Sequence, residues 1–155
     1  RVGEVCSLFN IDKNILNKKM VLLDDDLKQQ VVLASAIISK PSILLLDDCF
    51  SMLSFKNKRK IIKILNKLCK ESKMTVIMAT HDLDLVLSTS RVMVISNGRI
   101  VVDGLVKNVF KDREKIDTYN FSLPFIVELS KKLIDKGVIN NIYLDERKLV
   151  DVLWK

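Results

Sequence analysis

The sequence predicts an α/β fold in which a parallel sheet carries helices and is followed by a β-hairpin. Three observations support this prediction. Two apolar runs, 43–46 and 74–79, each end in charged or titratable residues. A helical pattern separates them, and this alternation is typical of a parallel strand–helix–strand unit. Further along, Asn97-Gly98 separates two short apolar runs, and this dipeptide is typical of a two-residue hairpin turn.

In the first part of the chain, acidic capping residues and a proline indicate where a predicted helix begins and ends. A short helical pattern covers residues 4–9, and a longer one covers Leu27 to Ser39. The acidic triplet Asp24-Asp25-Asp26 precedes the longer pattern, where carboxylates can cap free N–H groups and interact favourably with the helix dipole. Lys40-Pro41 ends the helix, because the residue before a proline avoids the α region.

The predicted sheet occupies the centre of the chain. The run Ile43–Leu46 is short and continuously apolar, which favours a strand buried on both faces. A helix is expected from Phe55 to about Lys70, and a second strand from Met74 to Ala79. The apolar face that we expect on the helix consists of Ile61, Ile62, Leu65 and Leu68.

The last third predicts a hairpin and then a separate small unit. We expect a helical turn at 82–87, strands at 91–95 and 99–102, and a turn at Asp103-Gly104. Residues 111–120 are polar, and we interpret them as a linker between domains at 1–110 and 121–155. The small domain is expected to hold helices at 124–136 and 145–154, a break at Gly137 and an extended segment at 138–144.

Composition narrows the possible kinds of site. The three cysteines are odd in number and form no C-x-x-C, which argues against a disulfide framework or a zinc site. The net charge of +7 could indicate nucleic acid or an anionic membrane as partner. However, the lysines are spread along the chain, and their densest run, 56–67, has few aromatic residues. A solvated helix face is therefore the favoured interpretation, and no apolar run approaches the ~18 residues of a membrane span.

Polar groups follow both predicted strands. Asp47-Asp48 ends the first, and Thr80-His81-Asp82 ends the second. Open α/β sheets bind ligands beyond the carboxyl ends of their strands, and carboxylates are suitable Mg²⁺ ligands. An imidazole from the neighbouring strand, here the chain's single histidine, could reach the same ligand. The sequence therefore predicts a phosphate-handling site at this edge.

These motifs resemble, in order and spacing, the C-terminal half of an ABC-type ATPase, a P-loop NTPase. Residues 43–48 look like its Walker B strand, and Ser51 to Ser54 occupy the place of its D-loop. Thr80-His81-Asp82 resembles its switch-histidine loop, and residues 92–104 resemble its closing hairpin. Leu23 to Ala34 stands where the family carries its signature, Leu-Ser-Gly-Gly-Gln.

The tail narrows the resemblance. Residues 121–125, the helix that follows and residues 144–154 look like the small α+β C-terminal domain of energy-coupling factor (ECF) ATPases. The resemblance implies ATP and Mg²⁺ as cofactors and import of vitamins or of transition metals such as cobalt. It also implies a second ATPase subunit, a transmembrane coupling subunit and a substrate-binding membrane subunit as partners, at the cytoplasmic face of the membrane.

The resemblance also implies roles for single residues. Asp47 matches the carboxylate of the magnesium shell, and His81 matches the histidine that contacts the γ-phosphate. Asp48 stands where the family has a glutamate that orients the attacking water. Because catalysis depends on accurate placement, the shorter aspartate predicts slow hydrolysis. Ser51 and Ser54 fall at D-loop positions that face nucleotide.

Two departures from the family are prominent. Asp24, Asp25 and Asp26 replace the signature serine and both glycines, and Leu27 replaces the glutamine. A carboxylate ~4 Å from a phosphate oxygen costs about 1 to 4 kcal/mol, so we predict a non-functional signature and a heterodimer with another ATPase subunit. No G-x-x-x-x-G-K-[ST] is present in the 155 residues, so these residues alone are expected to bind ATP weakly or not at all.

These departures keep two other interpretations open. One is a non-catalytic scaffold derived from a degenerate or split ATPase half. The other is a soluble ABC ATPase that acts on nucleic acid, in which the basic charge would be functional. The chain begins at Arg1 within a helical pattern, and we interpret it as part of a longer protein.

Overall fold

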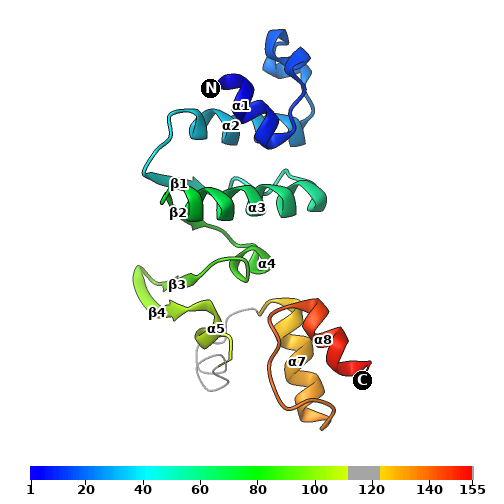
Figure 1. The fold of residues 1–155 in the computed structure, drawn as a ribbon. Helices are drawn as coiled ribbons and strands as arrows, with labels where there is room; N and C mark the ends of the chain where they lie inside the picture. Colours follow the sequence, from blue (N-terminus) through cyan, green and yellow to red (C-terminus); the bar gives the residue numbers. More distant parts are fainter. Residues whose placement is uncertain (112–122, 155) are drawn as a thin grey trace. The chain divides into compact units, whose positions relative to one another are not determined.

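The computed structural model describes residues 1–111 and 123–154 and shows a mixed α/β chain (Figure 1). It divides into two compact units, Arg1–His81 and Asp82–Lys155. The first unit contains the helices α1 (Val2–Phe9), α2 (Asp25–Ile38) and α3 (Phe55–Glu71), the strands β1 (Ile43–Asp47) and β2 (Thr75–Ala79), and the 3₁₀ turns η1 (Lys13–Asn17) and η2 (Met20–Leu22). The predicted helices and strands of this part are confirmed, and the two 3₁₀ turns were not predicted.

The predicted parallel sheet is confirmed for β1 and β2, which pair from Ile43 opposite Thr75 to Asp47 opposite Ala79. The expectation that β1 is buried on both faces is wrong. Its side chains alternate, with Leu44 and Leu46 each 6% exposed but Leu45 70% exposed. A continuous apolar run therefore fills one face of the strand and leaves Ile43 and Leu45 uncovered among the described residues.

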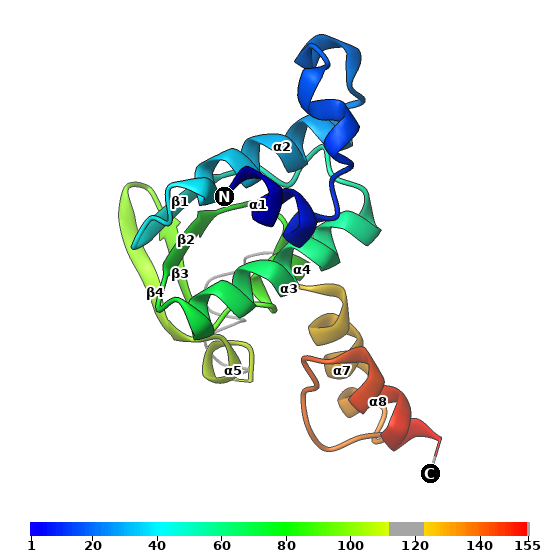
Figure 2. The ribbon, with the colours of Figure 1, turned by 45° about the horizontal axis from the view of Figure 1, so that its top comes forward.

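The core of the first unit lies where α1 packs against both α2 and α3 (Figure 2). Phe9 and Ile61 are completely buried, and Leu33 of α2 is almost so. The predicted apolar face of α3 is rotated slightly from its expected position. Ile64 is buried together with Ile61 and Leu65, whereas the predicted Ile62 and Leu68 are only partly buried.

The second unit contains α4 (Leu83–Val86), β3 (Arg91–Ser96), β4 (Arg99–Leu105), α5 (Val106–Val109), α7 (Phe125–Asp135) and α8 (Glu146–Leu153). The predicted hairpin is confirmed: β3 and β4 are antiparallel, and Asn97 and Gly98 have the positive φ angles of 49° and 72° that a type I′ turn needs. The predicted turn at Asp103-Gly104 is wrong, because β4 continues through both residues and Gly104 pairs with Val92.

The described part of the tail is helical. Helices α7 and α8 pack around a core that includes Val127 and Leu149, and the predicted break at Gly137 is confirmed by its φ of 70°. Residues 138–144, expected to be extended, form bends that bury Ile139 and Ile142, without a strand in 123–154. The predicted linker at 111–120 falls almost entirely outside the described residues, so the boundary there stays a prediction. Within the described ranges, no helix is long and apolar enough to cross a membrane.

Candidate functional site

The carboxyl ends of β1 and β2 lie next to each other at one edge of the sheet. Asp47 is paired with Ala79, and the backbone N–H of Asp48 donates to the carbonyl oxygen of Ala79 at 2.9 Å. The chain therefore leaves the two strands with Asp47-Asp48 on one side and Thr80-His81 on the other. The structure brings the predicted carboxylates and the predicted imidazole to the same edge.

The three side chains at this edge are exposed. Among the described residues, the carboxylates of Asp47 and Asp48 and the imidazole of His81 have no hydrogen-bond or ion-pair partner. Asp48 adopts a left-handed backbone with φ of 40°, a conformation that aspartate tolerates better than most residues. The strand ends abruptly at this turn, and its acidic groups remain available to a ligand.

The segment after Asp48 is fixed to the core. Phe50 is 1% exposed and Leu53 is 5% exposed, and the Ser51 hydroxyl donates to the carbonyl oxygen of Asp48 at 3.2 Å. Ser54 is the N-cap of α3, but its side chain makes no capping hydrogen bond. The predicted D-loop residues Ser51 and Ser54 thus belong to a tightly held turn that connects the sheet edge to α3.

Each carboxylate of the acidic triplet has a partner within the chain. Asp24 caps α2, because its Oδ1 accepts from the Leu27 N–H at 2.8 Å. Asp25 forms an exposed ion pair with Lys28 at 2.9 Å. Asp26 instead contacts the start of α3, which lies 28 to 31 residues further along the chain. The sequence predicted the helix cap but not the contact of Asp26 with α3.

The Asp26 carboxylate accepts hydrogen bonds from three residues, Ser54, Asn57 and Gln30. Its Oδ2 lies 2.9 Å from Nδ2 of Asn57 and 3.3 Å from the backbone nitrogen of Ser54. Its Oδ1 lies 3.4 Å from Nε2 of Gln30, a side chain that is 7% exposed. Burial alone would raise the pKa of Asp26, but hydrogen bonds from the Ser54 side chain and from these three groups outweigh it and hold the pKa below its ordinary value. Asp26 therefore remains ionised at neutral pH.

Cys49 lies immediately beyond the acidic pair. Burial raises the pKa of its thiol, and the neighbouring carboxylates of Asp48 and Asp47 raise it further. A thiol with a raised pKa is mostly protonated at neutral pH and reacts slowly.

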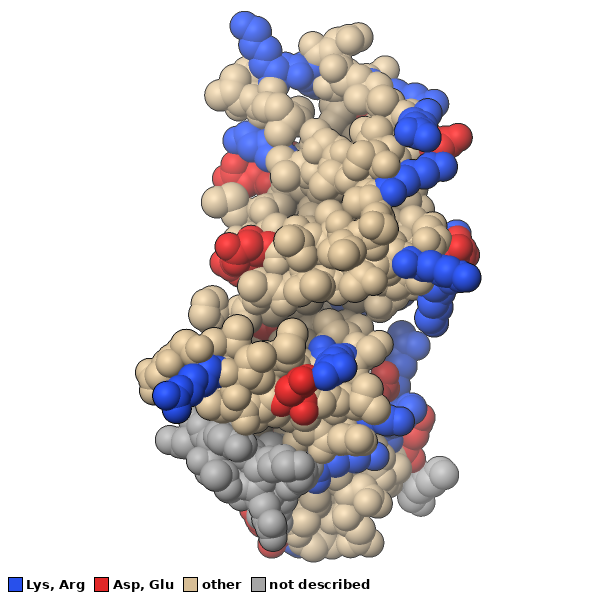
Figure 3. Space-filling model, turned by 90° about the vertical axis from the view of Figure 1, so that its left-hand side faces the viewer, with Lys and Arg blue, Asp and Glu red and all other residues tan. Residues whose placement is uncertain are grey.

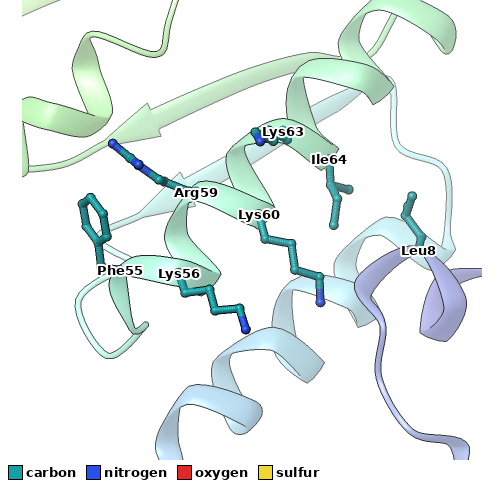
Figure 4. Close-up of a pocket in the computed structure, with 7 residues that line it drawn as sticks. All are labelled: Leu8, Phe55, Lys56, Arg59, Lys60, Lys63 and Ile64. Carbon is teal, nitrogen blue, oxygen red and sulfur yellow. The ribbon is translucent and has the colours of Figure 1, made fainter. Parts of the chain in front are cut away.

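A groove with a volume of about 540 Å³ lies between α1 and α3 (Figure 4). It is lined by Leu8, Phe55, Lys56, Arg59, Lys60, Lys63 and Ile64. The Arg59 guanidinium lies 4.5 Å from the centre of the Phe55 ring, and the Lys60 ammonium donates to the carbonyl oxygen of Phe9. No predicted site residue lines this groove, so it is distinct from the candidate site.

The donor set at the sheet edge suits a magnesium ion only in part. Within 1–111 and 123–154, no group of three or more His, Cys, Asp or Glu side chains is arranged so that it could hold a metal ion. Mg²⁺ needs only one or two carboxylates when waters and substrate phosphates complete its octahedron, so Asp47 fits that role. The 155 residues contain four glycines and no phosphate-binding loop, so they do not form a complete phosphate site.

Comparison with solved structures defines the class of protein. CbiO1 from Clostridium perfringens, described as part of the ABC transporter complex cbiONQ, matches with a TM-score of 0.63 and 30% identity, over 84% of this chain and 52% of that one. A dimeric bacterial ABC transporter cassette matches with a TM-score of 0.64 and 26% identity, over 68% and 45%. The fold is that of an ABC-type ATPase cassette.

Comparison with curated sequences narrows the class further, although no family model matches the chain. The energy-coupling factor transporter ATP-binding protein EcfA of Malacoplasma penetrans is 35% identical over 143 residues, 92% of this chain and 50% of the relative. EcfA1 of Listeria innocua is 34% identical over 129 residues, 83% and 46%. The chain belongs to the ABC-type ATPases, resembles their ECF members as predicted, and spans about half the length of these relatives.

Proposed function

We propose that the chain is part of an ATP-binding subunit of an ECF-type ABC transporter, which couples ATP binding and hydrolysis to the import of a vitamin or a transition-metal ion. The single observation that carries the proposal is the shared sheet edge. The hydrogen bond from the Asp48 N–H to the Ala79 carbonyl oxygen holds the ends of β1 and β2 together, so Asp47 and Asp48 lie at the same edge of the sheet as His81. The names and sequence similarity of the relatives supply the transporter class.

Each residue of this edge has a separate role in the proposal. Asp47 would contribute a carboxylate to the magnesium shell, and the bound ion would neutralise phosphate charge. Asp48 would accept a proton from, and orient, the attacking water. His81 would donate a hydrogen bond to the γ-phosphate, a type of contact that stabilises charge in the transition state. The phosphate-binding loop would come from residues other than these 155.

The acidic triplet determines which assembly we propose. Asp24 and Asp26 are engaged as a helix cap and as a contact to α3, which supports a signature position used for structure and not for phosphate. One composite site of the dimer would then be degenerate, and a heterodimer with a second ECF-type ATPase would supply the active one. A transmembrane coupling subunit and a substrate-binding membrane subunit would complete the complex on the inner face of the membrane.

A non-catalytic scaffold is the second candidate, and the same contacts of Asp24 and Asp26 favour it. The third candidate, an ATPase that acts on nucleic acid, draws on the cationic lining of the groove between α1 and α3. On the one face drawn in Figure 3, uncharged side chains predominate, with Lys and Arg side chains scattered among them. On this face, the described Lys and Arg side chains of each unit do not form a continuous basic surface of the kind that phosphate backbones select.

The proposal is tested on the natural polypeptide that contains these residues. Asp47→Asn should weaken Mg-ATP binding by about tenfold or more in calorimetry, a size typical of perturbed metal sites.

His81→Ala should lower kcat on the order of 100-fold, as loss of a transition-state donor does. Glu71→Gln removes an exposed carboxylate on α3 that only pairs with Lys67 at 3.9 Å and serves as the control. Mg-ATP binding that is unchanged in Asp47→Asn would support the scaffold instead.

A further inference from the structure

We propose that Asp26 is a positioning residue that holds the start of α3, and with it the turn 51–54, against the start of α2. The contribution of this contact to ATP hydrolysis rests on the proposed function, whereas the contact itself does not. The residue replaces a signature glycine in the family that the chain resembles. A glycine has no side chain that could make this contact, so the contact depends on the aspartate.

The geometry assigns this role to one oxygen in particular. Oδ2 of Asp26 accepts from Asn57 Nδ2 at 2.9 Å and from the Ser54 backbone nitrogen at 3.3 Å. Both donors belong to the first turn of α3 or its N-cap. The other oxygen faces its own helix, where Gln30 Nε2 lies at 3.4 Å. One ionised side chain therefore joins the N-terminal ends of α2 and α3.

Electrostatics at the start of α3 explain why a carboxylate serves there. The first N–H groups of a helix lack internal partners, and the helix dipole favours a negative charge beside them. The natural cap of α3, Ser54, makes no side-chain capping bond, and the first turn of α3 holds no acidic residue. Asp26 supplies the missing negative acceptor from α2. Hydrogen bonds to an ionised group are also stronger than those between neutral groups.

The contact extends to the candidate site through a short turn. Between the sheet edge and α3, the Ser51 hydroxyl donates to the Asp48 carbonyl oxygen at 3.2 Å and holds the start of the turn. Phe50, just before the turn, and Leu53, within it, are buried. Asp26 holds the far end of the turn at Ser54. The turn 51–54 determines how the chain leaves Asp48. Removing the Asp26 carboxylate therefore loosens this turn at Ser54.

Hydrogen exchange on the natural full-length polypeptide tests the contact directly. Asp26→Ala should speed amide exchange across residues 51–57 by about tenfold or more, because local opening becomes easier. Asp26→Asn keeps a carbonyl acceptor and should restore part of the protection. Asp25→Ala removes the adjacent carboxylate, which within the described part of the chain pairs only with Lys28 on α2, and should leave exchange at 51–57 unchanged. Equal exchange in Asp26→Ala and Asp25→Ala would overturn the proposal.

A double-mutant cycle separates a direct contact from general damage. Asn57→Ala should speed exchange at 51–57 when Asp26 is present and have little further effect in Asp26→Ala, because the two side chains share one interaction. If the double variant speeds exchange by the product of the two single-variant factors, the side chains of Asp26 and Asn57 do not interact, and the proposal is overturned.

ATPase kinetics test whether this contact positions the site. If the natural polypeptide hydrolyses ATP, Asp26→Ala should lower kcat several-fold while KM for ATP stays unchanged, and Glu71→Gln, which loses an exposed pair with Lys67, should change neither. An unchanged kcat in Asp26→Ala would overturn the positioning role. A polypeptide without ATPase activity, alone or with its partner subunits, would refute the proposed function, and the exchange experiment would then decide on Asp26 by itself.

Discussion

Asp26 differs from its two acidic neighbours in the direction of its contacts. Asp24 and Asp25 bind groups on their own helix, whereas Asp26 binds the start of α3. Sequence reasoning treats the triplet as three equivalent charges that would repel a phosphate. The structure shows that position 26 combines that charge with a long-range structural contact, and this contact has measurable consequences for pH and for mutation.

The lowered pKa of Asp26 predicts a pH-dependent contribution to stability. A carboxyl whose pKa is lower in the folded than in the unfolded state stabilises the fold above its unfolded pKa, and this contribution is lost as pH falls through the folded pKa. The ordinary pKa of this carboxyl is 3.8. Asp26→Asn should therefore lower the free energy of unfolding by about 1 kcal/mol at pH 7 and by progressively less below pH 3.8. Urea unfolding of both proteins at several pH values measures this difference.

The control for this prediction is Asp25→Asn, which removes the same charge one position earlier but no contact with α3. It should change the free energy of unfolding at pH 7 by less than about 0.5 kcal/mol, as most surface substitutions do. If the free energies of unfolding of wild type and Asp26→Asn differ by the same amount from pH 7 down to pH 3, ionisation of Asp26 does not stabilise the fold as predicted.

Cys49 should react slowly despite its position beside the candidate site. Burial and the carboxylates of Asp48 and Asp47 raise the pKa of its thiol, so little thiolate is present at pH 7 and alkylation is slow. Iodoacetamide labelling followed by mass spectrometry should show a rate below that of free cysteine. Asp48→Asn removes one of the two charges and should speed the labelling. A wild-type rate equal to that of free cysteine would exclude this electrostatic effect.

At the scale of single elements, local signals predicted most of the helices and strands. Asn97-Gly98 defines its hairpin because both residues tolerate positive φ, and Gly137 ends α7 for the same reason. Asp103-Gly104 has similar composition but continues a strand, because pairing with β3 determines its conformation. A dipeptide indicates a turn only where no neighbouring strand offers it hydrogen bonds.

Gly104 shows a packing requirement that the sequence does not reveal. A Cβ at this position would lie 3.1 Å from Cγ2 of Val109 on α5, so Gly104→Ala should destabilise the protein by about 1 kcal/mol or more through overpacking. Val109→Ala should relieve part of that cost in the double variant. At Gly98 an added Cβ would meet open space, but the φ of 72° disfavours any other residue. Gly98→Ala should therefore lower the stability by about 1 kcal/mol, whether position 109 is Val or Ala. Thermal unfolding of these variants provides the comparison, and a Gly104→Ala cost unaffected by Val109→Ala would rule out the clash.

Restoring the signature should have opposite effects on stability and on hydrolysis. In the assembled dimer, the triple substitution D24S/D25G/D26G removes the carboxylates that would repel a phosphate and restores the signature serine and glycines. This gain should outweigh the lost contact of Asp26 and raise ATPase activity. It should also be less stable than D24S/D25G by about 1 to 2 kcal/mol, because it loses the contact with α3 and places a glycine in a helix. Activity and melting temperature are measured on both variants. Activity that does not rise would contradict the interpretation of the triplet as a silenced signature.

At the scale of the whole molecule, the order of the motifs predicted the class of fold because each motif is a local pattern. The parallel pairing of β1 with β2 follows from an apolar run, a helix and a second apolar run. Burial could not be predicted in the same way, because exposure of Leu45 depends on what packs over the sheet and not on the strand itself. The contact between Asp26 and Asn57 joins residues 31 positions apart and leaves no periodic signal.

The last prediction concerns ATP binding by residues 1–155 alone. The sheet edge offers exposed carboxylates and an imidazole, but these 155 residues contain no loop whose N–H groups and lysine could hold β- and γ-phosphates. Without that cradle, the negative triphosphate meets the negative edge at Asp47-Asp48, so calorimetry with Mg-ATP should give a Kd weaker than about 1 mM, a free energy near −4 kcal/mol. The natural polypeptide that contains these residues is the matched comparison and should bind much more tightly. Micromolar binding by residues 1–155 would mean that a different set of groups holds the phosphates and would displace the sheet edge as the candidate site.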